Sequence, residues 1–483
     1  MLRFRLFFGK MAATFPVKEY QNLVVMKPKT IQHEPQRNLF RPELIDIVDP
    51  KHELVLLADR IDWDACEAYF GKLYKPGPGR PPLPTRMMVG LHLVKHMERL
   101  SDDASVKRWL DSPYVQYFCG EQYFQHEVPM DPTSMTRFRK RIGEQGAEQL
   151  LKLSIDAGLK TGTIKPESLK TAVIDTTVME KAIAHPSDSK LLQKSRERLV
   201  ALAREKGVKL RQTYEKEFGE LSYKASRYAH ARQMNRLKRT NRKMATRVGR
   251  LIRELLNKVP TEQMAGGFLD TLTRASTAIR QAVDPGMRTA DKIFAFHAPE
   301  VACIRKGKAR KPNEFGCKVS VMTTAKEGFV LCSHAMHGNP YDGHTVNRSL
   351  LKMHSVTGTL PRAVLADRGY KGSDRNYLFS HVHITGRKRG LGKAHELQHR
   401  RNSIEPIIGH MKNDGLMHRN WLKGEMGDKI NAVLCGAGQN LRMVLKKLRE
   451  LLCAWIFWPF SAVISEVIHT IRMLLQRQEM AVV

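Results

Sequence analysis

Two aspartates occupy positions where a sequence seldom places a charge. Asp175 lies inside the apolar, β-branched run "LKTAVIDTTVME", which predicts a buried strand. Asp367 ends a second apolar run, "LPRAVLADRGYKG", at a glycine-bearing turn, where an aspartate can also act as a simple cap. If the two strands are neighbours, the carboxylates repel each other and a bound cation is needed to offset that repulsion. Hard divalent cations prefer such oxygen ligands, so the pair indicates a metal site.

A third carboxylate, Glu405, stands among cations in the stretch "RRNSIEPIIGHMK". Steps of four, three and four residues along a helix would place Arg401, Glu405 and Lys412 on one face. Proline is tolerated only in the first turn of a helix, so Pro406 predicts a helix that begins near Asn402 or Ser403.

Two interpretations of Glu405 remain open. One is a surface ion pair with Arg401, worth a fraction of a kcal/mol. The other is a third metal ligand beside two phosphate-binding cations. Three carboxylates can hold two Mg²⁺ ions about 3.5–4 Å apart, and such a pair carries out phosphoryl transfer. If Glu405 is only a surface partner, Asp342 and Asp374 are the next candidates.

The overall charge indicates a polyanionic partner. The 483 residues include 81 Lys and Arg against 48 Asp and Glu, which gives a formal net charge of +33 and a pI of about 10.0. Such an excess favours binding to nucleic acid, since each cation that meets a phosphate releases a counterion. The seven cysteines form no CxxC pair and fit a reducing cytoplasm. The apolar stretch "LLCAWIFWPFSAVIS" is too short for a membrane span, and Pro459 is expected to interrupt a helix there.

The elements that must position these groups follow from the pattern along the chain. We expect an α/β fold with a mixed sheet and flanking helices. Predicted strands include "KIFAFH", "VACIRKG", a hairpin turning at Lys326–Gly328, and "HVHITGRK". The expected division is an irregular extension at 1–50, a helical DNA-binding domain at 51–165, a catalytic domain at 166–450 with a basic helical insertion at about 188–290, and a helical tail at 451–483.

Two segments are predicted to contact DNA. The first is the helix expected over Asp131–Gly146, which would form a helix-turn-helix with the helix that Ser101 caps. Its candidate contacts are Arg137, Arg139, Lys140 and Arg141. The second is Asp188–Lys258, which has 21 Lys and Arg against 7 Asp and Glu and is expected to form an antiparallel helix pair broken near Gly207 or Gly219.

Taken together, these motifs resemble the DDE transposases of the insertion sequence five family. The resemblance is carried by "VIDTTVMEKAIAHPSDSKLL", "GNPYDGHTV", "VLADRGYKG" and "RRNSIEPIIGHMK", and spans about Glu53–Lys446. Members of that family resemble one another in a Tyr-x2-Arg-x3-Glu-x6-Lys signature. Arg401, Glu405 and Lys412 fit its spacing, while Gln398 takes the place of the tyrosine and can still hydrogen-bond a phosphate.

This resemblance implies an RNase H-like catalytic core in which Asp175, Asp367 and Glu405 are the catalytic and metal-binding residues. It implies Mg²⁺ as the cofactor, with Mn²⁺ as a substitute, and contacts from Arg401, Lys412 and Gln398 to double-stranded DNA. The expected activity is cutting and joining DNA at the terminal inverted repeats of the protein's own insertion sequence, as a homodimer or higher oligomer on the bacterial nucleoid. The alternatives are a metal-dependent nuclease of the same fold and an inactive DNA-binding descendant.

Overall fold

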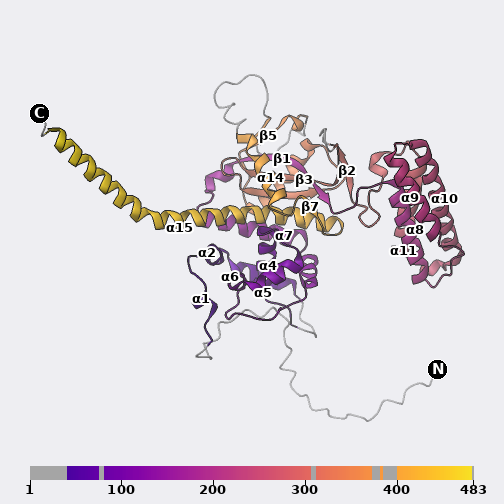
Figure 1. Cartoon of the computed structure of the whole chain (residues 1–483), viewed down its shortest axis with the longest axis horizontal. Helices are drawn as coiled ribbons and strands as arrows, with labels where there is room; N and C mark the ends of the chain where they lie inside the picture. Colours follow the sequence, from indigo (N-terminus) through magenta and orange to yellow (C-terminus); the bar gives the residue numbers. More distant parts are fainter. Residues whose placement is uncertain (1–40, 75–80, 306–311, 373–380, 385–399, 481–483) are drawn as a thin grey trace, which may run out of the picture.

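The computed structural model describes residues 41–74, 81–305, 312–372, 381–384 and 400–480, with side chains as far as residue 452. Helices surround one mixed sheet, which confirms the α/β part of the predicted fold class. In Figure 1 the sheet lies on one side of the long helix α15 (Gly424–Met480), the N-terminal helices lie on the other side, and four helices stand apart.

The sheet combines antiparallel and parallel pairing. Its path runs β2-β3-β1-β5-β6, with β4 paired to β3 and β7 paired to β1. β1 is antiparallel to β3 and parallel to β5, and β5 is parallel to β6. The strands are β1 (Thr171–Lys181), β2 (Ala302–Arg305), β3 (Asn313–Thr324), β4 (Val330–Met336), β5 (Ala363–Ala366), β6 (His381–Ile384) and β7 (Arg419–Asn420).

Most of the predicted strands are present. The hairpin between β3 and β4 turns where expected. Gly328 in this turn adopts a φ of +75°, which is unfavourable for any residue with a side chain. The prediction of a strand at "KIFAFH" is wrong: a 3-10 turn at Thr289–Asp291 is followed by irregular chain. Ile293 and Phe296 of this stretch are buried against the neighbouring helices, so their hydrophobicity reflects packing and not strand pairing.

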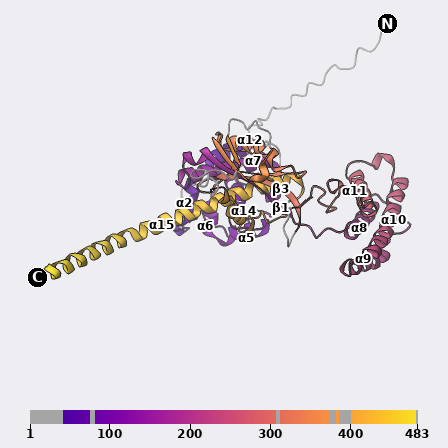
Figure 2. The same cartoon turned by 90° about the horizontal axis from the view of Figure 1, so that it is seen from above.

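The N-terminal helices share one core with the sheet. Leu91 of α4, Leu150 of α7, Ile174 of β1 and Leu434 of α15 all belong to a single buried cluster. Figures 1 and 2 show α15 running between the two groups and projecting beyond them. The helices are α1 (Leu44–Ile47), α2 (Glu53–Arg60), α3 (Trp63–Phe70), α4 (Thr85–Met97), α5 (Asp102–Asp111), α6 (Pro113–Phe118) and α7 (Thr133–Lys160), with 3-10 turns at Gly71–Leu73 and Pro166–Lys170.

The expected helix-turn-helix is not formed by the two helices that were predicted to build it. Ser101 does cap α5, since its hydroxyl accepts from the Ala104 amide at 3.0 Å. However, residues 112–132, including α6, separate α5 from α7, whereas the motif needs a turn of three or four residues. Arg137, Lys140 and Arg141 are exposed on α7, but α7 is not the second helix of a helix-turn-helix.

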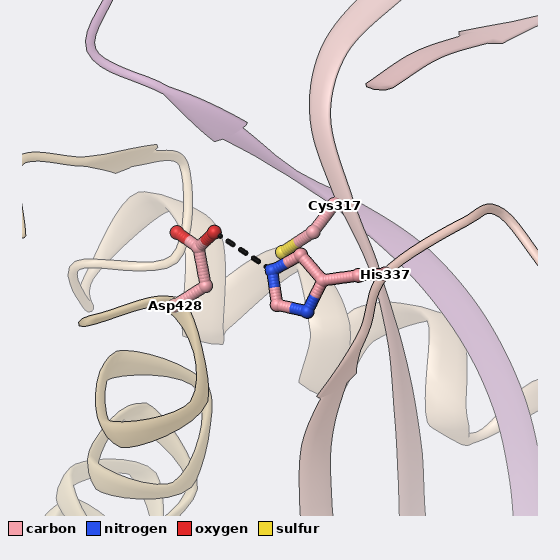
Figure 3. A group of neighbouring side chains, drawn as sticks. All are labelled: Cys317, His337 and Asp428. Atoms are coloured by element: carbon pink, nitrogen blue, oxygen red, sulfur yellow. Dashed lines mark hydrogen bonds and ion pairs between the residues drawn. The ribbon is translucent and has the colours of Figure 1, made fainter. Parts of the chain in front are cut away.

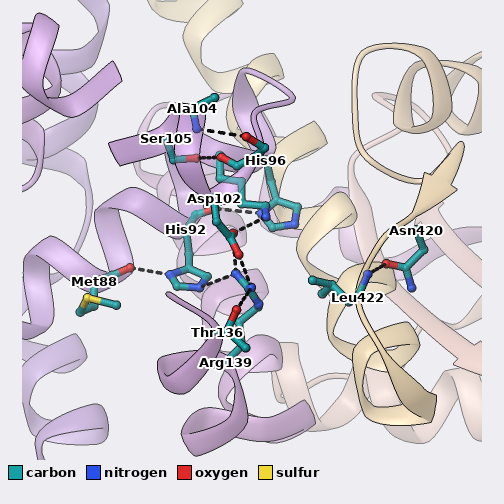
Figure 4. A network of polar contacts seen from close by, with 12 residues as sticks. Met88, His92, His96, Asp102, Ala104, Ser105, Thr136, Arg139, Asn420 and Leu422 are labelled. Atoms are coloured by element: carbon teal, nitrogen blue, oxygen red, sulfur yellow. Dashed lines mark hydrogen bonds and ion pairs between the residues drawn. The ribbon is translucent and has the colours of Figure 1, made fainter. Parts of the chain in front are cut away.

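Arg139 corrects the predicted set of DNA contacts. Its side chain is only 5% exposed, and its guanidinium donates to both carboxylate oxygens of Asp102, at 2.8 and 2.5 Å. Lys95 binds the same carboxylate at 2.5 Å, and the His92 ring lies alongside (Figure 4). Burial by itself raises the pKa of Asp102, but these two cations more than offset that effect and hold the pKa below its usual value. Arg139 is therefore a buried structural cation and not a phosphate contact.

The basic segment Asp188–Lys258 forms three helices and not the expected antiparallel pair, and a fourth helix follows it within the predicted insertion. They are α8 (Asp188–Glu205), α9 (Glu215–His230), α10 (Met234–Lys258) and α11 (Gly267–Val283), with a 3-10 turn at Thr261–Gln263. They enclose a core of their own, with Leu199, Leu251 and Leu272 among its residues. Gly207 follows the end of α8 with a φ of +66°, as expected, whereas Gly219 lies inside α9.

Two helices complete the sheet region, namely α12 (Val346–Thr357) and α14 (Ile404–Asn413), along with 3-10 turns at Asp342–Thr345 and Arg368–Tyr370. The predicted interruption at Pro459 is wrong, because α15 continues past it to Met480. In the described part of the chain, no helix combines the length and apolarity that crossing a bilayer requires.

The Asp102 network predicts a stability effect. Asp102→Asn removes the anion that neutralises Lys95 and Arg139, and leaving buried charges without their partner should cost about 3 kcal/mol of unfolding free energy. Asp103→Asn, at the exposed next position, is the matched control and should stay within about 0.5 kcal/mol of wild type. Chemical denaturation compares the two, and equal stability of both variants would show that the network contributes little.

Candidate active site

The register of two parallel strands brings Asp175 and Asp367 together. Val173 of β1 pairs with Leu365 of β5, and each aspartate lies two residues further along its own strand direction. Side chains alternate along a strand, so both carboxylates project from the sheet face that carries Val173 and Leu365. Those two aliphatic side chains pack against Ile404 of α14. The aspartates therefore emerge beside the start of α14.

The start of α14 supplies the third carboxylate. The helix begins at Ile404 with Ser403 before it, which agrees with the prediction. Pro406 consequently falls in the first turn, where its missing amide costs nothing. Ile404 is fully buried against the sheet, whereas the side chain of Glu405 next to it is 62% exposed and reaches outward over the site.

Arg401 joins all three predicted carboxylates. One guanidinium nitrogen donates to Glu405 Oε1 at 2.8 Å, and the other lies 3.3 Å from Asp175 Oδ2 and 3.5 Å from Asp367 Oδ2. The Arg401 side chain is only 14% exposed. Glu405 and Arg401 do form the ion pair of the simpler interpretation, but the same guanidinium also holds the two strand aspartates.

A fourth carboxylate, Asp342, borders this group. Its Oδ1 accepts from Thr176 Oγ1 and from Lys318 Nζ, both at 2.9 Å. Gly369 shows how close Asp342 lies to Asp367: a Cβ on this glycine would stand 3.0 Å from Asp367 Oδ1 and 3.6 Å from Asp342 Oδ2. The sequence suggested Asp342 only as a substitute for Glu405, whereas the structure places it next to the other carboxylates.

The pKa of Tyr370 is affected by the negative charge of the neighbouring carboxylates. This residue is 1% exposed, and burial raises the pKa of its phenol well above the usual value, with Asp175, Asp342 and Asp367 adding to the effect. The phenol therefore stays protonated beneath the carboxylates. Sequence reasoning did not select Tyr370, Thr176 or Lys318. Thr176 and Tyr370 adjoin the two aspartate motifs, but nothing in the sequence pointed to Lys318.

The remaining predicted residues lie elsewhere. Lys412 is in the last turn of α14, half-buried and beyond the carboxylate group. Gln398 and Asp374 fall outside the described residues. On α7, Arg137, Lys140 and Arg141 are exposed, and the Arg141 guanidinium lies over the Tyr74 ring at 4.2 Å.

The kinds of donor here suit a hard divalent cation, but the oxygens of the three carboxylates do not all lie within 4.8 Å of one another, so they would have to move closer together to share an ion. The donors are carboxylate oxygens from two adjacent strands and one helix, and they already surround a single positive group. Oxygen-only donors of this kind suit Mg²⁺ or Mn²⁺ better than a softer metal. An ion held by these carboxylates would compete with the Arg401 guanidinium for the same oxygens.

Comparisons with known proteins cover part of the chain. Residues 42–141 match a family model described as a transposase domain (DUF772). The chain is also 50% identical, over 198 residues, to the uncharacterized protein ORF8 of the nfe locus of Rhizobium meliloti, a match that covers 41% of this chain and 95% of that protein. The chain therefore carries a transposase-family domain over residues 42–141. No solved structure matches it.

The transposase domain spans α1 to the first part of α7. It thus includes the Asp102 network and the exposed cations Arg137, Lys140 and Arg141, and it ends before β1. The carboxylate group lies outside residues 42–141, so its role rests on geometry and on the motifs in the sequence.

Competition between Arg401 and a metal is testable. Arg401→Ala should raise the affinity for Mn²⁺ about tenfold, since one charge-assisted hydrogen bond is worth about 1.5 kcal/mol. Isothermal titration of the full chain measures this affinity. Arg400→Ala, at the exposed preceding position, is the control and should change it little. An Arg401→Ala protein that binds Mn²⁺ as weakly as wild type would mean that the guanidinium does not compete with the metal for these oxygens.

Proposed function

We propose that the chain is a DDE transposase that cuts and joins DNA at the terminal inverted repeats of its own insertion sequence by two-metal phosphoryl transfer. The observation that carries the proposal is the meeting of Asp175, Asp367 and Glu405 around one guanidinium. The transposase domain at residues 42–141 supports the same role through a separate part of the chain.

The strand arrangement supports an RNase H-like core. β4, β3 and β1 form an antiparallel series, and β5 and β6 extend it in parallel on the far side of β1. The central strand and its parallel neighbour each contribute one carboxylate, and α14 contributes the third. We therefore assign residues 166–450 to a catalytic domain of this type, with α8–α11 inserted between β1 and β2.

Each residue of the site then has a distinct task. Asp175, Asp367 and Glu405 hold the ions, Asp342 is fixed by Thr176 and Lys318, and the buried sheet keeps the two aspartates in register. When bound, two Mg²⁺ ions activate the attacking water or 3′-hydroxyl and stabilise the leaving oxygen. Displaced from the carboxylates, Arg401 becomes available to a DNA phosphate, and Lys412 offers a second cation further along α14.

DNA is the partner that the charge distribution favours. Arg232, two residues before α10, and five cations of α10 are exposed, namely Arg236, Lys238, Arg239, Arg242 and Lys243. α7 adds Arg137, Lys140 and Arg141. We propose that α8–α11 follow the phosphate backbone, that the N-terminal helices bind the element ends, and that a homodimer or higher oligomer assembles there, on the nucleoid in the cytoplasm.

Glu405→Gln tests the catalytic assignment. The change keeps the shape of the side chain but removes a metal-binding charge, so Mg²⁺-dependent nicking of a duplex carrying the element's end should fall by at least about a thousandfold. Asp175→Asn and Asp367→Asn should behave alike, while DNA binding persists in all three. Asp414→Asn, just after the end of the same helix, should nick normally.

The outcome separates the candidate activities. If Glu405→Gln nicks DNA at a near wild-type rate, the Glu405 carboxylate is only a surface ion-pair partner of Arg401 and not a metal ligand. A wild-type protein that nicks the duplex but never joins a 3′-hydroxyl to target DNA would be a nuclease and not a transposase.

The salt dependence of DNA binding tests the role of α10. Changing Arg232, Arg236, Lys238, Arg239, Arg242 and Lys243 to glutamine should lower the slope of log affinity against log salt by about 0.9 for each phosphate contact that is lost. A matched variant carries glutamine at Lys194, Lys224 and Lys258, whose ammonium groups already pair with carboxylates in the same unit. Its slope should barely change. Equal slopes for wild type and the α10 variant would show that this surface does not meet phosphate.

A further inference from the structure

A second polar cluster lies on the same sheet face, away from the carboxylate site. Cys317 of β3, His337 just after β4, and Asp428 of α15 place one ligand atom each within 4.8 Å of one another (Figure 3). Cys317 pairs with Met179 of β1, four residues along the strand from Asp175, which corresponds to about 13 Å. This cluster is the only such group of three or more His, Cys, Asp or Glu side chains among the described residues.

Three separate elements aim their ligand atoms at one point. His337 Nε2 lies 3.1 Å from Asp428 Oδ2, and the register of Lys318 with Met336 sets Cys317 opposite His337. Cys317 and Asp428 are each 2% exposed, whereas the side chain of His337 is 16% exposed and leaves the cluster accessible to a water molecule. The other ring nitrogen of His337 lies 4.0 Å from Glu425 Oε2. A histidine that binds a metal through one nitrogen commonly turns the other toward a carboxylate in this way.

The charges around the cluster favour an additional cation. Asp428 Oδ1 accepts from Lys181 Nζ at 2.7 Å and from Asn420 at 2.6 Å, which leaves Oδ2 facing His337. The same ammonium lies 3.0 Å from Glu300. Two buried carboxylates thus share one ammonium, and the excess negative charge is costly unless a further cation offsets it.

The donor set selects the metal. A thiolate, an imidazole and a carboxylate suit Zn²⁺, while Mg²⁺ avoids sulfur. Tetrahedral zinc with such ligands needs donor atoms about 3.3–3.8 Å apart, so small side-chain rotations would suffice. We propose that Cys317, His337 and Asp428 form a zinc site, with water as fourth ligand and Glu425 supporting the histidine.

The consequence is a cross-link at the start of α15. The ion would tie the beginning of this helix, at its fifth residue, to β3 and to the residue after β4. Because α15 also packs on the N-terminal helices, the site would secure the connection between those helices and the sheet. The zinc proposal stands apart from the catalytic proposal, since the two sites share no residue and differ in metal preference.

Metal analysis of the full chain tests the proposal. Protein purified without chelators should contain about one zinc per chain, and Co²⁺ in its place should give a thiolate-to-cobalt charge-transfer band. Cys317→Ser and His337→Gln should each lose the zinc and weaken the band. Cys332→Ser is the matched control, because Cys332 is equally buried and has His334 Nδ1 at 3.4 Å but lacks the carboxylate. This control should keep both signals.

The outcomes are decisive in either direction. Wild-type protein with no zinc after incubation with Zn²⁺, and no thiolate band with Co²⁺, overturns the proposal without requiring any variant to fold. Retention of zinc by Cys317→Ser or His337→Gln overturns it as well. Asp175→Asn and Glu405→Gln should keep the zinc, so a failure of the transposase proposal leaves this test unaffected.

Discussion

Repulsion among carboxylates on one sheet face is the constraint around which this molecule is arranged. The parallel register of β1 with β5 fixes Asp175 beside Asp367, and α14 adds Glu405 at the same edge. Without a metal, Arg401 supplies the positive charge that lets them stay together. A group of anions held by one exchangeable cation suits a site that binds metal with its substrate, because the guanidinium can move from carboxylate to phosphate.

The remaining structure holds that edge in place and, under the proposed function, carries the surface that binds nucleic acid. Ile404 packs against Val173 and Leu365 directly behind the acids, so α14 cannot shift without opening the core. The N-terminal helices pack on the opposite face, where Ile174 and Val364 lie. The basic helices α8–α11 enclose a core of their own, which permits a highly charged surface without loss of packing.

The sequence was sufficient for the parts of the structure with local signals. Apolar runs located β1, β5 and the β3–β4 hairpin, and Pro406 located the start of α14. It could not show the register that sets Asp342 beside Asp367, because that proximity depends on pairing between distant segments. The prediction that Arg139 contacts DNA was wrong for a related reason. A charged residue is usually exposed to solvent, and only the packing of α4, α5 and α7 shows that Asp102 neutralises this one. The hydrophobic residues at 292–297 pack against helices. Their composition is the same as that of a strand, so the sequence alone cannot distinguish the two cases.

The central claim is that this acidic group holds a pair of divalent ions when DNA is bound. Electron paramagnetic resonance of the full chain, loaded with Mn²⁺ and a duplex carrying the element's end, measures the coupling between bound ions directly. We expect two strongly coupled Mn²⁺ ions about 3.5–4 Å apart, with the coupling lost in Asp175→Asn. A spectrum showing only isolated Mn²⁺, or a coupled pair that persists in Asp175→Asn, would contradict the account.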